Sequence, residues 1–212
     1  MSIAPKTAAF LAGGVALVGI GAMTIATLTR PAADLFAACR NGAVAGGAST
    51  IGGPFELVDE TGKTVTNTDV ITGPTLVYFG YTFCPDVCPL DLTRNAEATY
   101  QLDEQGYDVT PVFISVDAER DTPEVLAEFT DIMHPRMIGL TGSAEQIKAA
   151  SQAYKTYYSV QTPGDPYTLI DHSTQSYLML PEYGFVDFFS HNDSADLVAE
   201  KMACYLEAAE QA

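Results

Sequence analysis

A short buried strand that runs directly into a turn and then a helix is the strongest constraint on the fold. Residues 75–79 (TLVYF) are mainly apolar and have the length of a buried strand. Residues 80–85 supply a turn, and a helix is predicted from about residue 87 to residue 104. Asp86 is placed at its N-cap, and Gly106 ends it. A strand, a turn and a helix in this order predict an α/β fold.

The rest of the chain repeats this alternation of short strands and helices. A β-hairpin is predicted first, from residues 55–58 and 64–66 around a glycine-containing turn. A helix is expected to open at Thr122, with Pro123 and Glu124 in its first turn. Further strands are expected at 112–116, 137–140, 167–170, 176–180 and 185–189, and further helices at about 143–154 and 194–208. This order predicts a mixed central sheet with helices on both faces.

An uncharged segment precedes the predicted domain. Residues 7–29 contain 23 positions without a charged side chain, and as a helix they would span roughly 35 Å, enough to cross a hydrocarbon layer of ~30 Å. We predict one transmembrane helix in an N-terminal membrane anchor at 1–29, with a cleaved signal peptide as the alternative. Residues 30–53 are expected to be a flexible tether, and residues 54–212 the folded domain.

The expected location and the charge limit the partners. A small domain exported behind one N-terminal helix is expected outside the cytoplasm. This predicts a single-pass protein of a bacterial-type inner membrane, with its domain on the periplasmic side. The net charge of −17 at pH 7 argues against nucleic acid as a partner. The acidic surface is either simply solvated or steers the domain toward a basic protein.

Two cysteines lie at the turn between the buried strand and the helix. Cys84 and Cys88 are separated by three residues, so their sulfurs can share one metal ion or form one disulfide. The helix N-terminus favours thiolates, the form that binds metals and attacks disulfides. Thioredoxin-type redox motifs have two intervening residues, and the third one here leaves room for an ion.

Three sequence blocks resemble the Sco/SenC family of assembly factors for cytochrome c oxidase. They are YFGYTFCPDVCP at 78–89, FISVDAERDTPE at 113–124 and DHSTQSYLMLP at 171–181. The similarity runs from about residue 52 to the last helix, and three blocks in the right order are more specific than one. The resemblance implies a thioredoxin-like α/β fold with an N-terminal β-hairpin extension. The chain departs from the family pattern at Ala118, where a proline is usual, and at residues 73–74, where a basic residue is frequent.

The resemblance also implies one copper ion, Cu(I) or Cu(II), on Cys84, Cys88 and His172. Thiolates suit Cu(I), imidazole suits both oxidation states, and three ligands are fewer than a structural zinc site has. His172 is expected on a connecting loop, where Asp171 would orient its ring. The implied partner is cytochrome c oxidase subunit II, whose CuA centre would receive the copper. Other periplasmic copper carriers are further candidate partners.

The remaining histidines, cysteines and one methionine are given structural roles. His134 and His191 are expected to be exposed in polar turns, and Met179 is expected in the core. Cys204 is expected to pack within the last helix, whereas Cys39 falls in the tether. Four cysteines in a domain of this size do not establish a disulfide framework.

Other functions are compatible with the same residues. A thiol-disulfide oxidoreductase would use Cys84 and Cys88 as catalytic attacking and resolving thiols to reduce the CuA-site cysteines, and this role could coexist with copper delivery. A peroxidase would need only one activated cysteine and would leave His172 without a role. An acidic interaction domain without chemistry would make the cysteine pair accidental.

Overall fold

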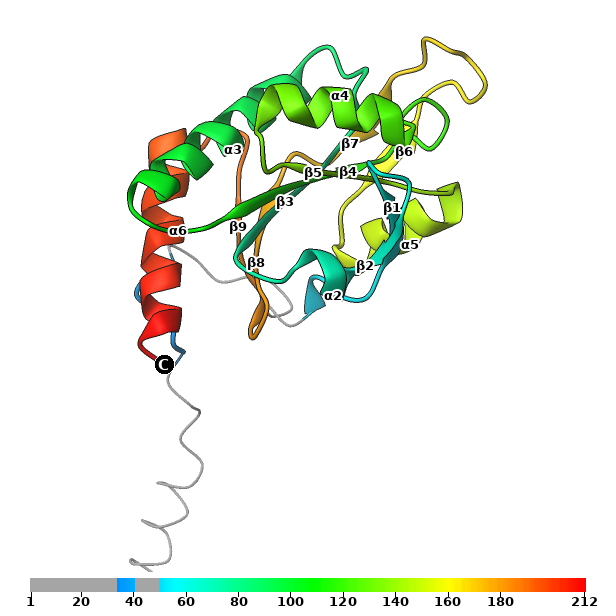
Figure 1. The fold of residues 1–212 in the computed structure, drawn as a ribbon. Coiled ribbons are helices and arrows are strands. Elements are labelled where there is room, and N and C mark those ends of the chain that lie inside the picture. The colour runs from blue at the N-terminus through cyan, green and yellow to red at the C-terminus, as the bar shows by residue number, and fades with distance from the viewer. Residues whose placement is uncertain (1–33, 41–49) are drawn as a thin grey trace, which may run out of the picture. The chain divides into compact units, whose positions relative to one another are not determined.

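The structure is a computed structural model, and it describes residues 34–40 and 50–212. Within these residues the protein forms a seven-stranded sheet (Figure 1). Its order is β2-β1-β5-β4-β3-β8-β9. The central strands β3, β4 and β5 are parallel, and antiparallel hairpins form both edges. The strands are β1 (Glu56–Asp59), β2 (Thr64–Thr66), β3 (Thr75–Gly80), β4 (Thr110–Ser115), β5 (Ile138–Thr141), β8 (Ser176–Leu180) and β9 (Gly184–Phe189). The predicted mixed sheet and its N-terminal hairpin are confirmed.

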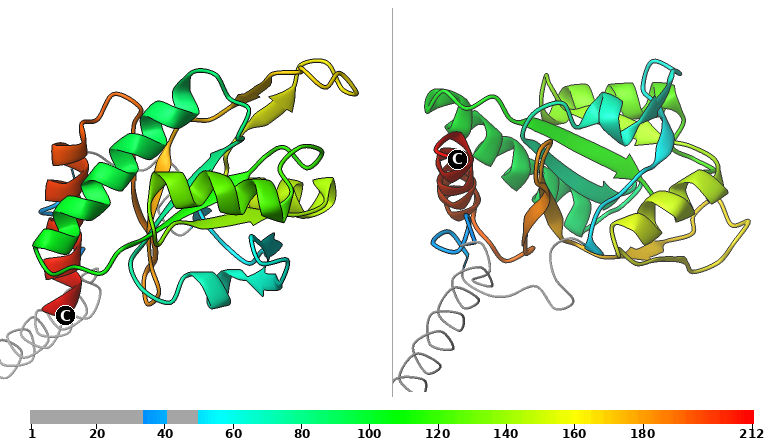
Figure 2. Two further views of the ribbon diagram at one scale, coloured as in Figure 1. Left: turned by 45° about the horizontal axis from the view of Figure 1, so that its top comes forward. Right: turned by 90° about the horizontal axis from the view of Figure 1, so that it is seen from below.

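Helices cover both faces of this sheet (Figure 2). On one face, Tyr78 of β3 bonds to Asp91 of α3 (Val87–Glu104), and Phe113 of β4 packs on Phe129 of α4 (Pro123–Met133). On the other face, Phe79 of β3 packs on Tyr154, the C-cap of α5 (Ala144–Ala153). The last helix, α6 (Ala195–Glu210), packs against α3. All six residues of β3 are buried, because side chains from both faces cover it.

The helix starts follow the local sequence. Thr122 caps α4 by accepting a hydrogen bond from the Val125 N–H, with Pro123 following it. Ser143 forms a capping box with Gln146 at the start of α5, and Ser194 caps α6. Asp86 precedes α3 as predicted, but its side chain makes no capping bond to the helix. Three of these four starts are therefore fixed by side-chain caps.

Three short elements were not predicted. A single-turn helix, α2 (Asn67–Val70), follows β2, and a separate two-stranded antiparallel sheet is formed by β6 (Tyr158–Val160) and β7 (Ile170–His172). The predicted strand at 167–170 is wrong except at Ile170. β6 has only three residues, all of them half-buried, which is shorter than the roughly four to eight residues over which alternation identifies a strand.

A second apolar cluster joins residues before the domain to α6. Phe36 is buried and packs edge-on against Tyr183 and Tyr205, and Cys39 forms a disulfide with Cys204. These contacts fix residues 36–39, which lie within the segment predicted as a tether. In the described ranges, no helix combines the length and apolar character needed to cross a membrane. The predicted anchor at 1–29 lies outside the described residues.

Candidate metal-binding site

The end of β3 and the start of α3 place both cysteines at one turn. The Cys84 N–H donates to the Tyr81 carbonyl, and buried Asp121 accepts hydrogen bonds from the N–H (3.0 Å) and hydroxyl (2.6 Å) of Thr82. Cys84 is half-buried in this turn, whereas Cys88 is buried in the first turn of α3. Both cysteines are free thiols.

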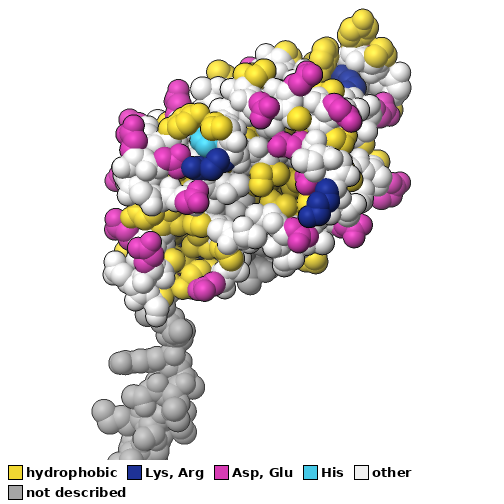
Figure 3. Space-filling model, in the orientation of Figure 1, with side chains coloured by type: hydrophobic (Ala, Val, Ile, Leu, Met, Phe, Trp, Pro, Cys, Tyr) yellow, Lys and Arg dark blue, Asp and Glu magenta, His cyan; other side chains and the backbone are white. Residues whose placement is uncertain are grey.

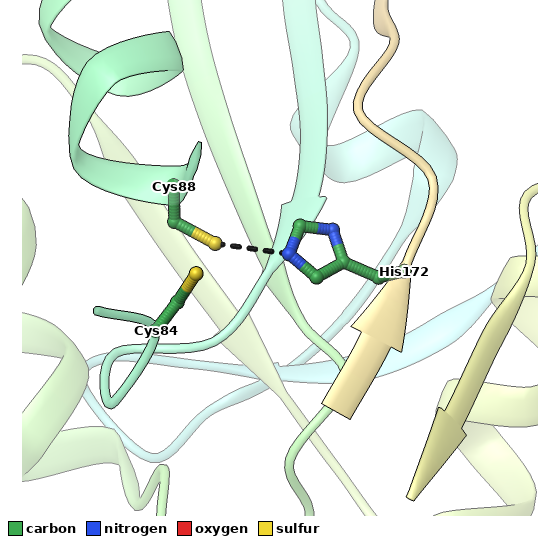
Figure 4. Close-up of side chains that lie close together, drawn as sticks. All are labelled: Cys84, Cys88 and His172. Atoms are coloured by element: carbon green, nitrogen blue, oxygen red, sulfur yellow. Dashed lines mark hydrogen bonds between the residues drawn. The ribbon is translucent and has the colours of Figure 1, made fainter. Parts of the chain in front are cut away.

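His172 approaches the two sulfurs from the end of β7 (Figure 4). Its Nε2 lies 3.2 Å from Cys88 Sγ, and its Nδ1 lies 2.9 Å from the Ser173 carbonyl oxygen. A carbonyl only accepts hydrogen bonds, so Nδ1 carries the proton and Nε2 presents its lone pair to the sulfurs. The prediction that His172 lies on a loop is wrong, because residue 172 pairs with Tyr158 of β6.

The three side chains together could hold a metal ion. One ligand atom from each of Cys84, Cys88 and His172 lies within 4.8 Å of the others. Two sulfurs and one imidazole nitrogen form a soft donor set, which suits copper better than hard cations that prefer oxygen. The predicted juxtaposition across 84 positions of sequence is thus confirmed, while the bound metal itself stays a prediction.

Burial controls the protonation of Cys88. Loss of solvent raises the pKa of its thiol well above the ordinary value, although a backbone hydrogen bond from Tyr81 opposes this shift. Burial thus opposes the thiolate form of Cys88 that the helix N-terminus was predicted to favour. A metal that binds Cys88 must displace its proton.

Two tyrosines, rather than Asp171, hold the His172 ring. Tyr78 and Tyr81 pack edge-on against it, with ring centroids 6.1 Å and 5.8 Å away. The predicted orienting role of Asp171 is wrong, because its carboxylate accepts a hydrogen bond from Gln161 and the Ser173 carbonyl holds Nδ1. Sequence reasoning missed both tyrosines. Their only signal was their position in the YFGY segment before Cys84, where aromatic residues are ordinary core residues.

The other assigned residues have mixed outcomes. His134 is buried beside Tyr100, and His191 is half-buried with its Nδ1 2.9 Å from Asp91, so the prediction that both are exposed is wrong. The ring partner of His134 (Tyr100) and the hydrogen-bond partner of His191 (Asp91) both lie on α3, far from the histidines in sequence, so local patterns do not reveal these contacts. Met179 is a core residue, as predicted. Cys204 is a disulfide partner rather than a simply packed residue.

The fold and the site define a thioredoxin-like domain with a three-ligand metal-binding site. The chain belongs to the SCO1/SenC family, whose sequence model matches residues 43–207. Protein SenC of Rhodobacter capsulatus is 57% identical to it, over 98% of this chain and 94% of that protein. The family comprises copper-binding proteins of cytochrome c oxidase assembly.

Two solved structures of similar proteins contain copper. Arabidopsis thaliana ScoI with copper bound is 42% identical with a TM-score of 0.70, covering 76% of this chain and 99% of that one. Bradyrhizobium japonicum ScoI with copper bound is 35% identical with a TM-score of 0.66, covering 73% and 99%. These similarities support the thioredoxin-like fold of the described domain.

Proposed function

We propose that this protein is a copper chaperone that binds one copper ion through Cys84, Cys88 and His172 and delivers it to the CuA centre of cytochrome c oxidase subunit II. The observation that carries the proposal is the approach of two sulfurs and one imidazole nitrogen to within 4.8 Å of one another. Copper in the solved ScoI structures supports the choice of metal. Family membership supports the choice of oxidase assembly as the process.

The unequal burial of the ligands suits transfer better than storage. Cys88 is fully buried, whereas Cys84 and His172 are half-buried. Three protein ligands leave a coordination position open. A cysteine or histidine of the acceptor could enter there and displace the ligands one at a time, so the copper would pass between proteins without release into water.

We propose that the domain works on the periplasmic side of a bacterial-type inner membrane, held by an anchor at 1–29. The Cys39–Cys204 disulfide supports a compartment outside the cytoplasm, because disulfides persist in oxidising compartments. The uncharged segment at 7–29 supports the anchor.

Replacing His172 by Ala tests the copper site. Because a direct ligand is lost, the Cu(I) affinity of His172→Ala should fall by more than ~100-fold, beyond the range seen for outer-shell changes. Competition with a Cu(I) chelator measures this loss. His191→Ala is the matched control, since it removes a half-buried imidazole that contacts Asp91 instead of the sulfurs. Equal affinity in His172→Ala and the wild type would refute the site.

A thiol-disulfide reductase is the second candidate, and the half-buried Cys84 thiol beside buried Cys88 favours it. The Cys84 thiolate would attack a disulfide of subunit II and form a mixed disulfide, which Cys88 would resolve. The products would be two acceptor thiols and a Cys84–Cys88 disulfide. His172→Ala separates the roles, because it should abolish copper delivery and leave this exchange in place. If metal-free protein reduces no oxidised subunit II fragment while loaded protein transfers copper, the reductase role is excluded.

A further inference from the structure

The two halves of the metal site belong to different sheets. Cys84 and Cys88 follow β3 of the main sheet, whereas His172 ends β7 of the separate two-stranded sheet. The distance between the imidazole and the sulfurs therefore depends on contacts that join the β6–β7 hairpin to the turn at residues 80–85, here called the cysteine turn. One such contact is the hydrogen bond from the Ile170 N–H to the Tyr81 hydroxyl, at 3.3 Å.

Arg120 makes a second connection between these two parts. Its Nη1 donates to the carbonyl of Pro166, in the loop between β6 and β7, at 3.2 Å. Its guanidinium carbon lies 4.9 Å from the ring centroid of Phe83 and 5.6 Å from that of Tyr81, both in the cysteine turn. One planar group thus contacts the turn that bears the sulfurs and the loop that leads to the imidazole.

A buried carboxylate fixes the direction of the Arg120 side chain. Nε of Arg120 is paired with Asp117, which is buried and also accepts a bond from the Arg120 backbone N–H at 3.2 Å. The Arg120 side chain is only 20% exposed, so this pairing is shielded from bulk water. A short loop after β4 therefore places the guanidinium between the two halves of the site.

These contacts need an arginine. A guanidinium offers five N–H donors in one plane and stacks on aromatic faces, whereas an ammonium is a compact, strongly hydrated charge. Lysine could keep the pairing with Asp117. It could not at the same time stack on Phe83 and reach the Pro166 carbonyl.

We propose that Arg120 is a positioning residue that sets the place of His172 relative to the two sulfurs and thereby the strength of the Cu–N bond. The inference rests on the proposed copper site. Asp121 provides a contrast within the same loop, because it bonds to Thr82 and Ser115 and supports only the cysteine half. Loss of Arg120 should weaken the nitrogen ligand selectively and leave the two sulfur ligands in place.

A double-mutant cycle tests this role. Arg120→Met should lower Cu(I) affinity by ~10-fold, the size of effect expected for a residue that orients a ligand. In the His172→Ala background, the same substitution should cause no further loss, because the nitrogen that it positions is gone. Arg120→Lys should lose nearly as much affinity as Arg120→Met. Arg136→Met is the charge-matched control, since Arg136 pairs with Asp103 and Asp108 and contacts neither half of the site.

Two further measurements separate positioning from general stability. The nitrogen hyperfine coupling in the electron paramagnetic resonance spectrum of the Cu(II)-loaded protein should weaken in Arg120→Met and stay unchanged in Arg136→Met. If Arg120→Met does not fold, Phe83→Leu removes the stacking surface of a half-exposed ring, and its smaller affinity loss should likewise vanish without His172.

The outcomes distinguish this inference from the proposed function. An equal affinity loss from Arg120→Met with and without His172 overturns the positioning role. So does an unchanged affinity in Arg120→Met when His172→Ala has weakened binding. If His172→Ala itself binds copper like the wild type, the proposed function fails and the role of Arg120 fails with it.

Discussion

The close packing around Cys88 requires a glycine at the end of β3. A Cβ added to Gly80, the last residue of β3, would lie 2.8 Å from Cys88 Sγ and 3.0 Å from the rings of Phe113 and Tyr78. The sulfur and both rings are fully buried, so none of them can move away into solvent. Gly80 therefore allows the end of the strand to lie close to the sulfur of Cys88, a proposed copper ligand.

Gly80→Ala should disturb stability and the metal site together. Forcing a methyl group into this packed space should lower the free energy of unfolding by about 1–3 kcal/mol, and displacement of Cys88 should weaken Cu(I) binding. Urea unfolding of the metal-free protein and chelator competition measure the two effects. Gly73→Ala is the control, because a Cβ there would meet nothing within 4 Å. If Gly80→Ala and Gly73→Ala have the same free energy of unfolding and the same Cu(I) affinity, the packing around Cys88 is looser than these distances imply.

At the scale of elements, the sequence predicted what local patterns determine. The strands at 75–80 and 176–180 are buried apolar runs, and Thr122, Ser143 and Ser194 mark helix starts, so these elements could be placed from local chemistry. The ligand set could be proposed from the sequence blocks.

The contacts around the site depend on tertiary structure that no local pattern encodes. The half-buried strand β6 is defined by its pairing with β7, and no local pattern indicates that Arg120 lies against Pro166. The disulfide is a similar case, because Cys39 and Cys204 are 165 positions apart.

A buried histidine, His134, lies where α4 meets α3 and should make the stability of the fold depend on pH. His134 is the C-cap of α4, and its ring packs on Tyr100 of α3 with centroids 4.5 Å apart. Its Nδ1 accepts the Arg136 N–H, so the neutral ring carries its proton on Nε2. Burial and then the nearby Arg136 charge lower the pKa of His134 below 6.5, although Asp103 opposes this.

This lowered pKa predicts a loss of stability in mild acid. The unfolded chain binds a proton at His134 as the pH falls below 6.5, before the folded protein does, so folding stability should decrease from there toward the lower folded pKa. Urea midpoints of the metal-free protein at about pH 7.5 and about pH 5.5, on either side of the unfolded pKa, measure this decrease. In His134→Gln the decrease should be smaller. Identical decreases in the two proteins would mean that other groups cause the effect.

At the scale of the whole molecule, acidic side chains greatly outnumber basic ones. The chain carries 27 acidic and 10 basic side chains, and Figure 3 shows acidic groups spread over one face with few lysines or arginines. Several of these few basic groups have specific partners within the fold, as Arg94 has in Asp91, Arg120 in Asp117 and Arg136 in Asp103. Each such pair cancels one basic and one acidic charge, so the net charge stays strongly negative while fewer basic groups are left unpaired. This excess of acidic groups favours encounters with basic protein surfaces and makes them sensitive to salt.

The Cys39–Cys204 disulfide connects the two ends of the described chain, so its removal should lower the stability of the whole domain. It closes a loop of 165 residues, so replacing both cysteines by serine should lower the free energy of unfolding by about 2–5 kcal/mol. Cu(I) affinity should hardly change, because the bond joins residues of the second apolar cluster, which contains none of Cys84, Cys88 and His172. Denaturant unfolding and chelator competition on the double variant measure both quantities. A large loss of copper affinity would show that α6 and the metal site are coupled, and a disulfide found reduced in protein isolated from cells would contradict the proposed periplasmic location.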